Sequence, residues 1–275
     1  MKLKKISIIG VGFMGGSLAL AIKKAYPEVF LWGYAYRKEH YKRLKRLNLV
    51  DRVTGDLRKL LKDATMVVLA TPVSTIVGYF KKIAPFLAEG TVVIDLGSTK
   101  HEIERKAKEY LPENINFVGC HPLCGSNKEG PENASRDIYK NSLCIITSFN
   151  KATPFVEKFW QRLGCRVYFM KSSLHDKVLS YVSHLPHVIS YALSYFVPKK
   201  YFSFSSGSFS YITRVSTSPE RVWEDVFFSN KDNIVNHIEG YIGILKEFKR
   251  AITSKDHKRL LRLIRKARKK HLSAK

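Results

Sequence analysis

The chain has 275 residues, enough for one large or two modest domains, and 48 basic against 23 acidic residues give it a formal net charge of +25. We expect a cytoplasmic protein without leader or membrane span, because basic residues run straight from Met1 into a strand and no apolar stretch approaches bilayer length. Four cysteines without a CxxC pair argue against zinc ligation and a disulfide framework, and favour reduced, mostly buried thiols.

The first predicted element is an apolar strand at residues 5–9, followed by a glycine turn and a helix. Gly10, Gly12 and Gly15 have the spacing GxGxxG, which permits a tight turn, close approach of the backbone to a pyrophosphate and close helix packing. The helix N-terminus that follows points free N–H groups at the phosphates. We predict dinucleotide binding by Gly10, Gly12, Phe13, Met14 and Gly15, rather than a tight turn in some other α/β protein.

The second predicted strand, residues 29–34, ends in a sequence that bears on the cofactor. NAD sites usually place an acidic residue here to hold the ribose 2′-hydroxyl. This chain has Ala35, Tyr36, Arg37 and Lys38 instead, and the basic pair can neutralise a 2′-phosphate. We therefore favour NADP over NAD, with Tyr36 and Arg37 at the cofactor. The alternative is that Arg37 lies on the surface and the site takes both cofactors.

Three more apolar strands are predicted at residues 66–70, 91–96 and 116–119, with a helix able to start at Ser74. Strands that alternate with helices imply parallel βαβ units, whose ligands lie outside the carboxyl ends of the strands. Thr71 and Pro72 follow one strand end, so we expect them at the cofactor. Ser98 and His121 lie just past the other two, and we expect them to face the same cleft.

Strands at 142–148 and 166–169, with a helix at 154–163 between them, complete a predicted dinucleotide-binding domain of residues 1–170. From residue 171 the pattern becomes helical, with segments at 174–196 and around Ile234 to Ile252. Between them, residues 201–211 are rich in Ser, Phe and Gly, and we predict an irregular active-site segment. The predicted class is α/β: a doubly wound, mainly parallel sheet, followed by an all-helical domain of residues 171–275.

The last predicted element is a basic amphipathic helix. Residues 246–275 contain 13 Lys or Arg against Glu247 and Asp256, and Leu260, Ile264, Ala267 and His271 fall on one stripe. A nucleic-acid arm fits the charge, but the segment has almost no aromatic side chains for base stacking. We favour a solvated face that attracts anionic ligands, and expect no nucleic-acid or membrane partner.

Five stretches then stand out together: residues 10–18, 95–100, 121–126, 183–187 and 213–219, with Trp223 beyond them. In this order and spacing they resemble the prephenate/arogenate (cyclohexadienyl) dehydrogenase family of tyrosine biosynthesis. The resemblance implies a Rossmann domain, a helical domain that forms a homodimer, and oxidative decarboxylation of a cyclohexadienol with a nicotinamide cofactor. It also leads us to expect neither a fused chorismate mutase nor an appended regulatory domain.

The resemblance assigns the two residues at the strand ends to catalysis. His121 matches the family histidine that accepts the hydroxyl proton, and Ser98 matches the serine that hydrogen-bonds the hydroxyl and the histidine. Imidazole suits this role because it can accept a proton near neutral pH. The alternatives are that His121 caps a strand end before Pro122 and that Ser98 is a helix N-cap.

Substrate-binding residues follow from the same resemblance. Arg214 matches an arginine that binds a substrate carboxylate, which a guanidinium can grip with two parallel hydrogen bonds. His187 and Trp223 are expected to face the substrate, and Ser126 to lie near its side chain. His184 and His187 have a spacing that would suit a metal, but no third ligand is placed to complete a site, so no metal is predicted.

We therefore predict a prephenate dehydrogenase that makes 4-hydroxyphenylpyruvate. Many family members place a charged or acidic pair before the Thr-Arg, where this chain has Ser210, Tyr211 and Ile212. The missing acid removes one way of holding the amino group of arogenate, although an arogenate dehydrogenase stays open. Other Rossmann reductases with helical domains are rivals, as is a non-catalytic nucleotide-sensing module that binds nucleic acid.

Overall fold

A computed structural model describes residues 2–125 and 127–273 of the chain. Ser126, one of the predicted substrate residues, lies outside the described residues. The chain packs as two compact units, Met1–Asn230 and Lys231–Lys275. The expected boundary at residue 170 coincides with the change from strands to helices, whereas packing keeps the helices up to Asn230 with the sheets.

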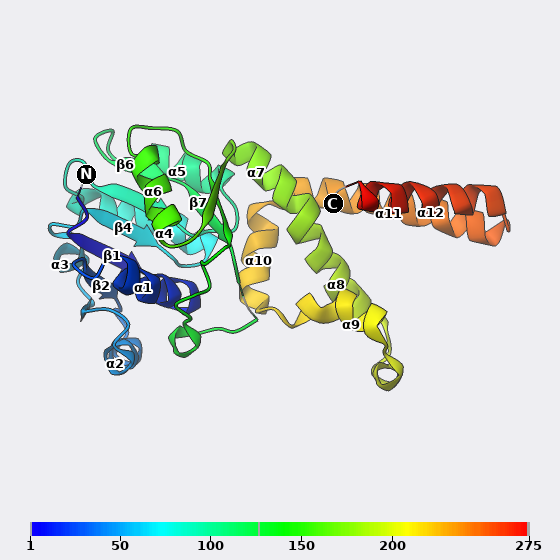
Figure 1. Cartoon of the computed structure of the whole chain (residues 1–275), viewed down its shortest axis with the longest axis horizontal. Helices are drawn as coiled ribbons and strands as arrows, with labels where there is room; N and C mark the ends of the chain where they lie inside the picture. The colour runs from blue at the N-terminus through cyan, green and yellow to red at the C-terminus, as the bar shows by residue number, and fades with distance from the viewer. Residues whose placement is uncertain (1, 126, 274–275) are drawn as a thin grey trace. The chain divides into compact units, whose positions relative to one another are not determined.

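The first unit contains two sheets (Figure 1). The larger sheet is parallel and has the strand order β3-β2-β1-β4-β5-β6. The smaller sheet has the order β7-β8-β9, in which β7 runs antiparallel to β8 and β9 runs parallel to it. The strands are β1 (Lys5–Ile9), β2 (Phe30–Tyr34), β3 (Arg52–Thr54), β4 (Met66–Leu69), β5 (Val92–Asp95), β6 (Asn116–Val118), β7 (Cys120–Leu123), β8 (Leu143–Ile146) and β9 (Arg166–Phe169). The predicted α/β class is confirmed.

Helices connect the parallel strands and continue after β9. Those of the sheet region are α1 (Phe13–Ala25), α2 (Lys38–Leu47), α3 (Leu57–Leu61), α4 (Val73–Ile83), α5 (His101–Tyr110) and α6 (Thr153–Arg162). The later ones are α7 (Ser172–Leu179), α8 (Leu185–Phe196), α9 (Gly207–Thr213), α10 (Glu220–Ser229), α11 (Lys231–Thr253) and α12 (His257–Leu272). Short 3-10 turns include η4 (Lys199–Phe204) and η5 (Arg214–Thr217).

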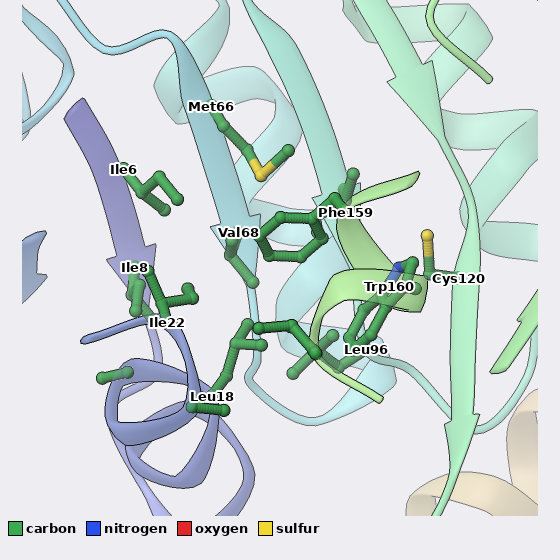
Figure 2. Close-up of a cluster of buried hydrophobic side chains, with 14 of the residues drawn as sticks. Ile6, Ile8, Leu18, Ile22, Met66, Val68, Leu96, Cys120, Phe159 and Trp160 are labelled. Atoms are coloured by element: carbon green, nitrogen blue, oxygen red, sulfur yellow. The ribbon is translucent and has the colours of Figure 1, made fainter. Parts of the chain in front are cut away.

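Alternate side chains of the parallel strands point to opposite faces of the sheet, and helices cover both faces, so both are buried. Figure 2 shows one face, where Leu18 of α1 and Trp160 of α6 belong to the same cluster as Ile6, Ile8 and Val68. On the other face a second cluster contains side chains of the sheet and of α3, α4 and α5. This two-sided burial holds the strand ends in place.

Two details of the helical region differ from expectation. Residues 201–211 are not irregular: η4 and α9 cover most of them, and the rings of Phe202 and Phe209 pack with centroids 5.2 Å apart. This aromatic contact closes the two short helices onto each other. The helix predicted for 174–196 is interrupted by a π turn at Ser180–His184, which separates α7 from α8.

The second unit is a pair of helices, α11 and α12, joined by a short turn in which Lys255 is left-handed, with φ of 51°. The carboxylate of Asp256 accepts the N–H of Arg259 at 2.9 Å and caps α12, and Glu247 pairs with the Arg259 side chain across the two helices. The predicted basic C-terminal helix is therefore present. No helix in the described part of the chain is long and apolar enough to cross a bilayer.

The glycine turn depends on two different properties of its glycines. Gly10 has φ of +99°, which side chains other than hydrogen disfavour, and a Cβ on Gly15 would lie 2.1 Å from the carbonyl oxygen of Gly10. A Cβ on Gly12 would meet nothing within 4 Å. Gly15 thus lets α1 pack against the turn, while Gly12 leaves open space beside it.

Gly15→Ala should destabilise the protein by about 1–3 kcal/mol, because the methyl group forces α1 away from the turn. Gly12→Ala is the matched control and should keep the wild-type melting temperature. Thermal unfolding of the three proteins measures both effects. Equal melting temperatures for wild type and Gly15→Ala would contradict this account of the turn.

Candidate active site

The ends of four neighbouring strands form one row at the carboxyl edge of the parallel sheet. Tyr34 pairs with Ile9, Ile9 with Leu69, and Leu69 with Asp95. The strand order reverses between β1 and β4, and ligands of such sheets bind in the crevice at this point. The loops that leave this row and the first turn of α1 carry all the residues predicted at the cofactor and one predicted catalytic residue, namely Gly10, Gly12, Phe13, Met14, Gly15, Tyr36, Arg37, Thr71, Pro72 and Ser98.

The edge at β1 and β2 fits a dinucleotide. The turn is open beside Gly12 at the start of α1, and helix N-termini of this kind favour phosphate groups. Past β2, Ala35 is buried in the core, whereas Tyr36 is 65% exposed and Arg37 is exposed beside it. The Arg37 Nε donates to the Tyr36 hydroxyl at 3.0 Å. An exposed aromatic ring and a guanidinium therefore lie side by side just past the end of β2.

A buried ion pair anchors the loop after β5. Asp95 and Lys100 are both fully buried, and the Lys100 ammonium donates to Asp95 Oδ2. The same carboxylate accepts the N–H of Gly97 at 2.8 Å and, through Oδ1, that of Cys120 at 3.1 Å. Because lysine is rarely buried without a partner, this pair holds the loop containing Ser98 and the start of β7 in fixed positions.

A second buried carboxylate, Asp176 of α7, caps α5. Its oxygens accept the N–H groups of Lys100 at 2.8 Å and His101 at 2.9 Å. Burial raises the pKa of Asp176, but the hydrogen bonds from His175 and from these amides outweigh it and hold the pKa below its ordinary value of 3.8. Since Asp176 supplies this cap, the alternative that Ser98 caps the helix is wrong, and Ser98 is half-buried in the loop.

His121 lies within β7 rather than in a loop past a strand end, and it is 8% exposed. Its Nδ1 is 2.8 Å from Nε2 of His175, and the His175 Nδ1 is 2.8 Å from Oδ1 of Asp176. Burial, with the nearby charges of His175, Lys100 and His184, holds the pKa of His121 well below 6.5. No hydrogen bond between Ser98 and His121 is present in the described part of the chain.

Three of the four predicted substrate-binding residues, His187, Arg214 and Trp223, lie on α8, η5 and α10. The rings of His187 and Trp223 are stacked, with centroids 3.3 Å apart and planes at 19°. The Nδ1 of His187 donates to the carbonyl of Ser183 at 2.8 Å. Burial lowers the pKa of His187, the Ser183 carbonyl opposes this, and the positive charge of Arg214 lowers it further. Arg214 therefore lies within electrostatic range of the stacked pair.

His184 links the two groups of residues. It is buried, its ring meets the Trp223 ring edge-on at 6.1 Å, and its charge would oppose that of His121. The amide of Asn230 contacts its Nδ1 at 3.1 Å, and burial lowers the pKa of His184 to about 4. His184 is therefore the packed member of the histidine pair, while His187 is half-buried.

Three important residues were not among the predictions: His175, Asp176 and Lys100. A histidine and an aspartate adjacent at the start of a helix are the only signal the sequence offers for the first two. Lys100 belongs to the stretch 95–100 identified above, but nothing in the sequence indicates that its side chain is buried. Within residues 2–125 and 127–273, no three His, Cys, Asp or Glu side chains are placed to hold a metal ion. All four cysteines are unpaired, and Cys120, Cys144 and Cys165 are buried, as expected.

Family models match most of the chain. The model described as prephenate dehydrogenase, nucleotide-binding domain, matches residues 18–169, and prephenate dehydrogenase, dimerization domain, matches residues 171–266. A cyclohexadienyl dehydrogenase of Zymomonas mobilis is 32% identical over 283 residues, covering 99% of this chain and 96% of the relative. A prephenate dehydrogenase of Bacillus subtilis is 30% identical over 277 residues, covering 96% and 74%.

A solved structure extends the likeness to three dimensions. Prephenate dehydrogenase from A. aeolicus, in complex with hydroxyphenyl propionate and NAD+, matches with a TM-score of 0.90 and 29% identity, covering 100% of this chain and 99% of that one. The resemblance inferred from the motifs is thereby confirmed. Because these matches extend along nearly its whole length, the chain belongs to the prephenate dehydrogenase family.

Proposed function

We propose that this protein oxidises and decarboxylates prephenate to 4-hydroxyphenylpyruvate. Members of its family are NAD(P)-dependent oxidoreductases, and the site has the groups that the reaction needs: a base, a hydroxyl and a cation. The observation that carries the proposal is the position of His121. It is a buried imidazole whose pKa is held well below 6.5, on the strand that Asp95 of β5 anchors through the N–H of Cys120.

His121 is the proposed general base. Its Nδ1 faces His175, which leaves Nε2 to accept the proton of the substrate's C4 hydroxyl. Its lowered pKa keeps it able to accept a proton throughout the neutral pH range. Ser98 is proposed to orient the hydroxyl from the anchored loop. A bound nicotinamide supplies the hydride acceptor, and loss of the ring carboxylate as carbon dioxide yields the aromatic product.

Arg214 is the proposed anchor for a substrate carboxylate. It is exposed and makes no salt bridge with any residue in the described part of the chain, so its guanidinium can bind a ligand with two hydrogen bonds. His187 and Trp223 form a flat aromatic surface beside it, which we propose contacts the substrate.

Prephenate is favoured over arogenate by the residues before Arg214. Ser210, Tyr211 and Ile212 of α9 are exposed and uncharged. They supply no carboxylate for the amino group that distinguishes arogenate. An arogenate dehydrogenase is the alternative, and the two substrates can be compared directly.

NADP is the favoured cofactor. Arg37 is exposed past β2, and Ala35 takes the place at which an acidic residue would repel a 2′-phosphate. We further propose a homodimer formed through the helical region. Tyr195, Phe196, Phe204 and Tyr211 are each more than four-fifths exposed, which is costly for large apolar rings unless another surface covers them.

His121→Asn should lower kcat with prephenate by about 10²–10⁴-fold, because no base remains at the hydroxyl. Cofactor affinity should not change. Absorbance at the nicotinamide band, with prephenate and arogenate each offered with NAD and NADP, measures turnover and tests the proposed function. His257→Asn on α12 is the control and should turn over like wild type. If His121→Asn does so too, the mechanism is wrong.

Arg214→Ala should raise KM for prephenate by about 10- to 100-fold, with a smaller effect on kcat, because a charge-assisted hydrogen-bonded pair is lost. The exposed Arg221 of α10 provides a matched control, since Arg221→Ala removes an equal charge nearby. Steady-state kinetics separate the two constants. A KM that rises equally in both variants would show that only general charge attraction is involved.

Arg37→Ala should weaken NADP binding about tenfold and leave NAD binding within about twofold, because only NADP carries the 2′-phosphate. Titration of each cofactor into wild type and variant gives the four dissociation constants. NAD serves as the internal control. Equal losses for both cofactors would mean that Arg37 contacts a part they share, and the NADP preference would be refuted.

A further inference from the structure

We propose that His175 and Asp176 are positioning residues that keep the imidazole proton of His121 on Nδ1, so that Nε2 is the atom that takes up the substrate's proton. The inference rests on the proposed function, in which His121 is the base. It assigns a role in the reaction to two buried residues that hold the network together from α7, outside the predicted site.

The geometry is an unbranched line of three groups. Asp176 Oδ1 contacts His175 Nδ1 at 2.8 Å, and His175 Nε2 contacts His121 Nδ1 at 2.8 Å. His175 is fully buried and Asp176 nearly so. Both distances are those of hydrogen bonds, so each contact needs one donor and one acceptor.

The carboxylate decides which atoms donate. Asp176 also accepts the N–H groups of Lys100 and His101, and these bonds favour the ionised carboxylate, which acts only as an acceptor. The Nδ1 of His175 must therefore donate. Burial lowers the pKa of His175 despite the opposing effect of Asp176, which favours a neutral ring whose Nε2 has a lone pair.

The same reasoning applies to the ring of His121. Because His175 Nε2 accepts, Nδ1 of His121 must donate, and a neutral imidazole with its proton on Nδ1 has a lone pair on Nε2. The reverse order would place two lone pairs, or two N–H groups, face to face at one of the contacts. The carboxylate of Asp176 thus selects the tautomer of His121, although His175 lies between them.

The proton step then balances without transfer along the line. The O–H bond of the substrate breaks, its electron pair stays on the oxygen, and the proton forms an N–H bond at Nε2 of His121. The imidazolium keeps its Nδ1 proton and continues to donate to His175. The negative charge of Asp176 favours this cation, as the third member of a Ser-His-Asp triad does for its histidine.

Asp176 also caps α5, so a test must separate the two roles. Asp225 of α10 provides the matched control, because it caps α4 in the same way, accepting the N–H of Ser74 at 3.1 and 3.3 Å. In the described structure Asp225 contacts no histidine. Asp176→Asn and Asp225→Asn therefore make the same chemical change at two helix caps, only one of which lies in the line.

Asp176→Asn should lower kcat with prephenate by about 10²–10⁴-fold with KM within about threefold, because an amide N–H facing His175 reverses the order of donors. Asp225→Asn should stay within about threefold of wild type in kcat. Nitrogen-15 NMR of histidine-labelled enzyme, with His121 assigned from His121→Asn, should find the His121 proton on Nδ1 in wild type and Asp225→Asn, and on Nε2 in Asp176→Asn.

A second pair of variants leaves the helix cap untouched and serves if Asp176→Asn does not fold. In His175→Gln the amide can donate to Asp176 and accept from His121, so kcat should fall less than about tenfold. In His175→Phe neither bond forms, and kcat should fall about 10²–10⁴-fold. Equal kcat for these two, or an unmoved His121 proton in Asp176→Asn, overturns the inference. If His121→Asn itself retains wild-type turnover, the proposed function fails instead.

Discussion

Asp176 is a buried carboxylate whose charge must be stabilised inside the protein, and the groups that stabilise it determine much of the geometry of the site. An ionised carboxylate in the interior needs a hydrogen-bond donor for each of its oxygens. The two amides at the start of α5 and the ring of His175 supply them. Satisfying one buried charge therefore fixes a loop of the parallel sheet, the first turn of α5 and the orientation of two histidines.

The parallel sheet and the helices from α7 onward contribute different chemical groups to the site. The sheet brings its strand ends into one row and leaves backbone groups and small residues for a phosphate-bearing ligand. The helices contribute His187, Arg214 and Trp223, which we propose contact the substrate, whereas the proposed base His121 lies on β7. The carboxylates of Asp176 and Asp225 join the two, since each belongs to a later helix and caps an earlier one. Their placement explains why α7 to α10 pack with the sheets as one unit.

The fold was largely predictable because its signals are local. Apolar runs marked β1, β4 and β5, and the glycine spacing marked the turn before α1. The residues at strand ends, such as Thr71 and Ser98, followed from topology alone. His175 and Lys100 did not, because their role depends on which partners the fold brings within 3 Å, and both residue types are usually solvated. The helices at 201–211 were missed since a contact between two phenylalanines, rather than local propensity, orders that segment.

The π turn between α7 and α8 sets the rotational phase of everything after it. His175 and His187 are twelve residues apart, and an uninterrupted helix at roughly 100° per residue would turn them roughly 120° away from each other. One extra residue accommodated in the turn takes back most of that angle. Shortening the segment by a single residue would rotate His187 and the rest of α8 by about 100° relative to His175, and so break the stacking of His187 on Trp223. The relative placement of His175 and His187 is thus tied to a count of residues as much as to their identity.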